Sequence, residues 1–129
     1  KDKGELSRVT LRNLSEVLKG FAPQVFLSNV FMGLRKEKYS NTEAFPENLN
    51  VAYLSICKAF LNYQIEMVKP RLIITLGHTP HEFLLSNIEL KNEKVLNIPH
   101  PSMWHFNLKN SGLEKEDIKR LISNAYNRV

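Results

Sequence analysis

The stretch that most constrains the fold of this 129-residue chain is an apolar helix pattern that ends at a proline and leads directly into a short apolar strand. Over residues 49–69, apolar side chains recur at the spacing of one helix face. Pro70 cannot continue that helix. Residues 72–76, Leu-Ile-Ile-Thr-Leu, are typical of a strand, and Gly77 follows them. Such a chain is expected to alternate helices with strands.

The remaining elements repeat this alternation. Apolar periodicity and turn residues predict a helix over residues 6–20, a strand over 25–32, a helix over 79–86, a strand over 95–98, a loop over 99–102 and a last helix after residue 111. The run over 25–32 is almost entirely apolar, which predicts a strand buried on both faces. The last helix is expected to bury Ile118, Leu121, Ile122, Ala125 and Tyr126.

Two sequence signatures predict helix starts. Thr79 with Glu82, and Ser111 with Glu114, each have the spacing of a capping box, in which two side chains satisfy free backbone amides. Gly20 is expected to stop the first helix.

The order of these elements predicts an α/β fold, a three-layer αβα sandwich around a central parallel sheet. We expect residues 1–129 to form a single domain, because this length builds one core and no repeat or linker interrupts it. Three strands make a small sheet for this architecture, so we expect one or two further strands upstream of the sequence.

Composition narrows the classes of function. The net charge of +5 and the pI of about 9.4 suit a polyanionic partner such as DNA, although a mild lysine excess on an ordinary surface has the same effect. Cys57 is the single cysteine, which excludes an internal disulfide and a multi-cysteine metal site within this chain. We interpret it as a small core residue, and a reducing cytoplasm fits it. No apolar run is long enough to span a membrane.

Three predicted strand ends carry the residues that indicate a site. Ligands of open parallel sheets bind beyond the carboxyl ends of the strands, where Asn29, Gly77 and His100 are expected to converge. An amide matches the edge of a pyrimidine, and a stiff imidazole between two prolines can face a developing anion. Each residue also has a structural interpretation: a satisfied polar group, a turn glycine, or a loop histidine bonded to backbone.

Three segments in this order resemble the uracil-DNA glycosylase superfamily. They are Val-Phe-Leu-Ser-Asn-Val at 25–30, Lys-Pro-Arg-Leu-Ile-Ile-Thr-Leu-Gly at 69–77, and Ile-Pro-His-Pro-Ser at 98–102. The resemblance covers about residues 24–105. It implies that Asn29 reads the edge of uracil and that His100 hydrogen-bonds the uracil carbonyl as charge develops on the leaving base.

The resemblance also implies a DNA-binding set, made of Gly77, His78, Pro101, Ser102 and Trp104. Gly77 and His78 would hold a phosphate, and Pro101 and Ser102 would contact the DNA backbone beside the lesion. Trp104 falls at the family position whose side chain wedges into the emptied base stack. The alternative interpretation of Trp104 is a partly exposed aromatic side chain that packs on the last helix.

The activity implied is a DNA repair reaction, hydrolysis of the N-glycosidic bond of uracil or a related damaged base flipped out of DNA. The family's Gly-rich loop with a water-positioning residue does not occur between residues 1 and 24. A nucleic-acid-binding relative without catalysis is therefore the alternative. We expect no cofactor.

Two further alternatives stay open. His78, His81, His100 and His105 supply four imidazoles, but their spacing is not a standard zinc pattern, and we expect no metal site. Binding of a small molecule at the same sheet edge is the other. The sequence does not indicate the preferred base, the preference for single or double strands, or the oligomeric state.

Overall fold

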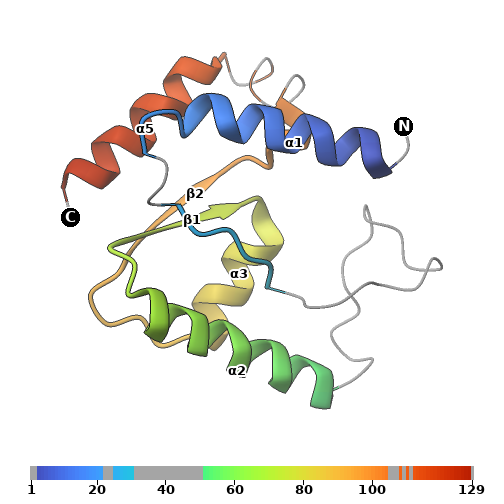
Figure 1. Cartoon of the computed structure of the whole chain (residues 1–129), viewed down its shortest axis with the longest axis vertical. Helices are drawn as coiled ribbons and strands as arrows, with labels where there is room; N and C mark the ends of the chain where they lie inside the picture. Colours follow the sequence, from blue (N-terminus) through green and yellow to red (C-terminus); the bar gives the residue numbers. More distant parts are fainter. Residues whose placement is uncertain are drawn as a thin grey trace.

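From residue 51 onward the elements follow the predicted alternation in the computed structural model, which describes residues 3–21, 25–30, 51–104, 108, 110 and 112–128 (Figure 1). In chain order they are α1 (Lys3–Val17), α2 (Val51–Val68), β1 (Leu72–Leu76), α3 (His78–Asn87), β2 (Lys94–Ile98), the 3-10 turn η1 (Pro101–Met103) and α5 (Lys115–Asn127). The strand predicted over 72–76 is confirmed at both ends. Within the described residues, no helix is long and apolar enough to cross a membrane.

The sheet of the described residues consists of β1 and β2, which run parallel with Leu72 opposite Lys94 and Leu76 opposite Ile98. Helix α3 makes the crossover between them and packs on β1, while α5 packs on β2. Figure 1 shows α1 and α5 on one side of the strands and α2 and α3 on the other. This arrangement is compatible with an α/β fold, whereas the complete three-layer sandwich is not confirmed.

Residues 25–30 are the main departure from the prediction, because they are extended without forming a strand. Val25, Phe26 and Leu27 are exposed, with fractions of 38%, 56% and 60%. The prediction of a doubly buried strand is therefore wrong for these residues, and 31–32 lie outside the described part. An apolar run is buried only where neighbouring strands and helices cover it, and β1 pairs with β2 instead.

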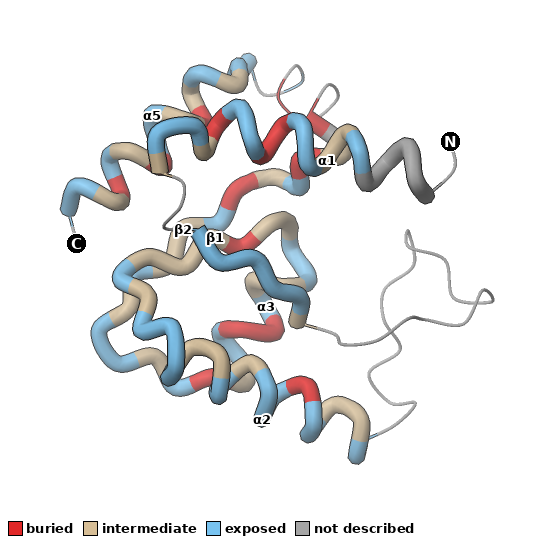
Figure 2. The backbone as a smooth tube through the Cα atoms, viewed as in Figure 1, coloured by how far each residue is buried: buried red, intermediate tan, exposed pale blue. Residues whose placement is uncertain are grey.

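The core lies where α1, β2 and α5 meet, as the buried segments in Figure 2 show. Its buried members are Val17, Ile98, Trp104, Leu108, Ile118 and Ile122. On α5 the predicted burial of Ile118, Ile122 and Ala125 is confirmed, but Leu121 is 45% exposed, so that prediction is wrong. Tyr126 is half-buried, with its ring 5.4 Å from that of Phe21.

Both predicted capping boxes are wrong. Helix α3 has Gly77 as its N-cap, two residues before the predicted cap Thr79, and no side-chain cap, so Thr79 lies inside the helix. Helix α5 has a different box, formed by Glu114 and Asp117, and the Glu114 amide donates to Asp117 Oδ2 at 2.8 Å. Ser111 lies outside the described residues. Both signatures had the right spacing. However, α3 begins after Gly77, which has a positive φ, and α5 begins at the box of Glu114 and Asp117.

Candidate functional site

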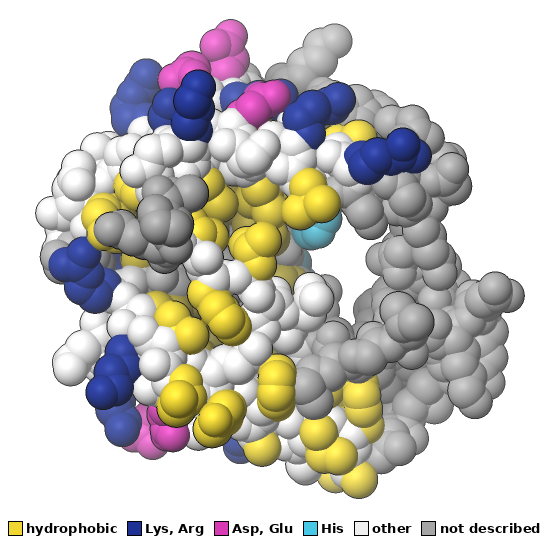
Figure 3. Space-filling view, in the orientation of Figure 1, with side chains coloured by type: hydrophobic (Ala, Val, Ile, Leu, Met, Phe, Trp, Pro, Cys, Tyr) yellow, Lys and Arg dark blue, Asp and Glu magenta, His cyan; other side chains and the backbone are white. Residues whose placement is uncertain are grey.

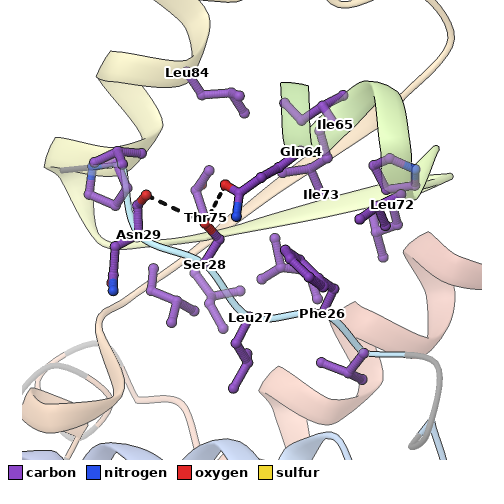
Figure 4. A pocket seen from close by; sticks show the side chains of 18 of the residues that line it. Phe26, Leu27, Ser28, Asn29, Gln64, Ile65, Leu72, Ile73, Thr75 and Leu84 are labelled. Atoms are coloured by element: carbon purple, nitrogen blue, oxygen red, sulfur yellow. Dashed lines mark hydrogen bonds between the residues drawn. The ribbon is translucent and has the colours of Figure 1, made fainter. Parts of the chain in front are cut away.

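A cavity of about 830 Å³ lies beside β1 and contains both residues on which the predicted site depends. Asn29, from the extended segment, and His100, from the loop after β2, line the same space. Figure 4 shows the segment 25–30 running beside β1 along this cavity, and Figure 3 shows apolar side chains gathered in the middle of this face, with Lys and Arg along its outer margin. The predicted convergence of these two residues is therefore observed.

The ring of His100 is held by the turn that it caps. Its Nδ1 accepts a hydrogen bond from the Ser102 backbone amide at 3.2 Å and lies 2.8 Å from the Ser102 hydroxyl. A backbone amide can only donate, so Nδ1 carries no proton in this arrangement. The neutral ring then carries its proton on Nε2, which is left as a donor.

We expect the pKa of His100 to lie below the ordinary histidine value of 6.5, because surrounding protein atoms desolvate the ring although part of it is exposed. An NMR titration of the ring measures it. Since the folded pKa is the lower one, protonation favours the unfolded chain. The contribution to stability is complete above pH 6.5 and is lost as the pH falls through the folded pKa. A ring that titrates at or above 6.5 would contradict this assignment.

Gly77 brings the start of α3 against the His100 loop. Its amide donates to the Ile98 carbonyl at 2.8 Å, and its φ of 91° and ψ of −176° lie in a region that side chains avoid. A Cβ on Gly77 would lie 3.5 Å from the Cβ of His100. His78, Pro101 and Ser102 flank these two positions in sequence, so four of the five residues predicted to bind DNA lie at one edge of the sheet.

Replacement of Gly77 by alanine is expected to lower the free energy of unfolding by about 1–3 kcal/mol, because alanine is strained at this φ and ψ. Urea denaturation measures the loss. The matched control is Gly20→Ala, which also has a positive φ, of 101°, but nothing within 4 Å of its Cβ. Only Gly77→Ala should also shift the NMR signals of the His100 ring. Equal shifts of the His100 signals in both variants would show that Gly77 has no specific contact with the His100 loop.

Sequence reasoning missed Asn13, on α1. Its Nδ2 donates to the Pro101 carbonyl at 2.7 Å, across 88 residues of sequence, and the side chain is 4% exposed. Its Oδ1 is buried without a partner among the described residues. A lone asparagine beside Leu14 on the apolar face of the first helix was the signal for this contact.

Trp104 does not match its predicted role. It is 2% exposed, its Nε1 donates to the Pro99 carbonyl at 2.7 Å, and it belongs to the core with Ile118 and Ile122 of α5. A ring in this position is not available to wedge into DNA. The alternative is confirmed in its packing on the last helix, but the ring is buried rather than partly exposed, because a large ring is stabilised more by the apolar core than by water.

His81 and Cys57 have structural roles. His81 Nδ1 lies 3.0 Å from the hydroxyl of buried Thr75, which donates to Asn97 Oδ1 at 2.9 Å. Among the residues described, no three His, Cys, Asp or Glu side chains form a group that could hold a metal, and His105 lies outside that part. Cys57 is free and 1% exposed on α2, as a small core residue should be.

With the site in place, comparison with protein families identifies the chain's relatives. The family model described as the uracil DNA glycosylase superfamily matches residues 6–122. The chain belongs to this superfamily. The match covers most of α1 and most of α5, beyond the segments that carry the resemblance in sequence. Neither the curated proteins nor the solved structures contain a significant match. Membership in the uracil DNA glycosylase superfamily supports a glycosylase-like function and DNA as the partner.

Proposed function

We propose that this member of the uracil DNA glycosylase superfamily hydrolyses the N-glycosidic bond of uracil, or of a related damaged base, flipped out of DNA. The observation that carries the proposal is that Asn29 and His100 line one cavity. Extrusion is required because the anomeric carbon is out of reach inside a duplex. The positive net charge of +5 favours approach to the polyanion.

Asn29 is the residue proposed to recognise the base. Its amide both donates and accepts, as the edge of a pyrimidine does. The neighbouring Ser28 hydroxyl donates to Gln64 Oε1 on α2 at 2.7 Å, which ties the segment to a helix. Figure 4 shows Asn29 and Ser28 on this segment, with Gln64 across from Ser28. The tie limits the positions that the amide can take.

His100 is proposed to stabilise the departing base. Bond cleavage leaves negative charge on the base, and the Nε2 proton of a neutral imidazole can donate to its carbonyl oxygen. The Ser102 contacts fix the ring's orientation, and its lowered pKa favours the neutral form at physiological pH. The first amides of α3, after Gly77 and at His78, are suited to a phosphate beside the lesion.

A second candidate, DNA binding without hydrolysis, is favoured by the polar groups of the cavity. Its described lining contains the amides of Asn29 and Gln64 but no aspartate or glutamate. Hydrolysis needs a carboxylate or an amide that positions the water. The amides can serve that purpose, so we place hydrolysis first and binding alone second.

A release assay distinguishes the two candidates. An oligonucleotide with a single deoxyuridine is incubated with the protein, and free uracil and DNA affinity are measured together. The proposal expects uracil release that Asn29→Ala abolishes, while Asn62→Ala, on the exposed surface of α2, retains it. Binding without release supports the second candidate. Absence of both binding and release would reject both.

A further inference from the structure

The loop that carries His100 is held by its carbonyl groups. His100 lies between Pro99 and Pro101, whose rings fix the backbone φ and remove an amide donor at each position. The Pro99 carbonyl accepts from the Trp104 indole at 2.7 Å, and the Pro101 carbonyl accepts from Asn13 Nδ2 at 2.7 Å. A side chain therefore holds the carbonyl on each side of the histidine.

The bond from Asn13 holds the peptide unit that also holds the imidazole. The Pro101 carbonyl and the Ser102 amide belong to the same planar peptide unit, which moves as a rigid body. The Ser102 amide of this unit donates to His100 Nδ1 at 3.2 Å. The Ser102 hydroxyl, 2.8 Å from the same nitrogen, is attached to the same residue. A hydrogen bond from α1 therefore fixes the plane of the peptide that orients the His100 ring.

The two hydrogen bonds of this peptide unit strengthen each other. A donor to the carbonyl oxygen draws electrons away from the amide nitrogen, which makes the N–H a better donor. The Asn13 amide therefore strengthens the Ser102 bond to Nδ1, and an accepting Nδ1 carries no proton. The neutral ring then keeps its proton on Nε2. That proton is the one that the proposed hydrolysis uses at the departing base.

The surroundings of Asn13 indicate a role other than packing. The side chain is 4% exposed, and its Oδ1 is buried with no hydrogen-bond partner among the described residues. Burial of an unpaired acceptor destabilises the folded chain, and an apolar side chain of similar size would avoid that cost. Asn13 is also absent from the lining of the cavity, so it does not contact the base. Its donor to the loop is what distinguishes it from an apolar residue.

We infer that Asn13 is a positioning residue, which acts through the peptide between Pro101 and Ser102 to hold His100 in the orientation and tautomer that direct the Nε2 proton toward the base. The effect on rate rests on the proposed function. The effect on the ring does not, because it can be measured without DNA. A purely structural link between α1 and the loop would change stability and leave the tautomer of the ring unchanged.

Nitrogen-15 NMR of the His100 ring, at a pH where the ring is neutral, tests this effect. The unchanged protein should show the proton on Nε2, whereas Asn13→Leu, which has a similar volume and no donor, should show a mixture of both tautomers. The control is Val17→Ala, because Val17 is 1% exposed in the core on the same helix and does not line the cavity. Its ring signals should match those of the unchanged protein.

A second variant, Asn13→Ala, also lacks the donor and should give the same mixture of tautomers if Asn13→Leu does not fold. A proton on Nδ1 in the unchanged protein would overturn the inference. An unaltered His100 ring in either folded Asn13 variant, or the same change of the ring in Val17→Ala, would also overturn it.

Rates show whether Asn13 acts through the histidine. At saturating DNA, Asn13→Leu should slow single-turnover uracil release roughly tenfold. In the His100→Ala background the same substitution should change the residual rate by less than about twofold, because the ring that it positions is absent. Equal slowing with and without the ring would overturn the inference. Absence of release by the unchanged protein would reject the proposed hydrolysis, while the NMR result would still decide the positioning of the ring.

Discussion

Replacement of Trp104 by alanine is expected to lower the free energy of unfolding by about 3–5 kcal/mol. The ring is 2% exposed within the core, and its removal leaves a cavity between Ile98 and α5. It also leaves the Pro99 carbonyl without the donor at 2.7 Å. Urea denaturation at fixed pH and salt measures the difference, provided that the slope of the transition is unchanged.

Leu121→Ala is the control for Trp104, because Leu121 is 45% exposed on the adjacent helix α5 and should change stability by no more than about 0.5 kcal/mol. DNA affinity, measured on the folded fraction of each variant, should stay the same. A Trp104 variant with normal stability and weaker DNA binding would restore the wedge interpretation that the structure contradicts.

Replacement of His100 by alanine is expected to reduce uracil release roughly 100- to 1000-fold, if the proposed hydrolysis occurs. The variant removes the Nε2 donor that would face the departing base. DNA affinity should be retained, because the backbone of the loop is still held by Asn13 and by the Trp104 indole. Single-turnover rates and binding titrations of one labelled oligonucleotide measure both quantities.

Two variants complete the His100 experiment. His81→Ala removes a histidine that does not line the cavity, so its rate should stay near that of the unchanged protein once stability is matched. Ser102→Ala keeps the backbone donor to Nδ1 and loses the hydroxyl, so it should have an intermediate effect. A full rate in His100→Ala would remove this residue from the mechanism.

Elements with strong local signals were predictable from the sequence. Pro70 ends the long helix and Gly77 ends the strand, and both limits depend on backbone chemistry that no tertiary contact overrides. The convergence of Asn29 and His100 followed from the rule for parallel sheets, although Asn29 is on an extended segment rather than on a strand.

The remaining errors concern properties that depend on distant partners. The apolar run at 25–30 has the composition of a buried strand, but burial depends on a neighbour that sequence does not specify. A tryptophan at position 104 suits a surface wedge and a core position equally well. Only the packing of α1 and α5 shows that the ring is in the core. The local signal of Asn13, its place on the apolar face of the first helix, did not identify its partner, which lies 88 residues away.

The bond from Asn13 to Pro101 joins the beginning of the chain to the turn that orients the histidine. A substitution that displaces the first helix would therefore misalign the His100 imidazole without removing it. Loss of the Asn13 amide, which does not line the pocket, would then imitate a chemical knockout while every pocket residue remained intact. Genetic screens for inactive variants should recover substitutions in the first helix as well as substitutions in the pocket.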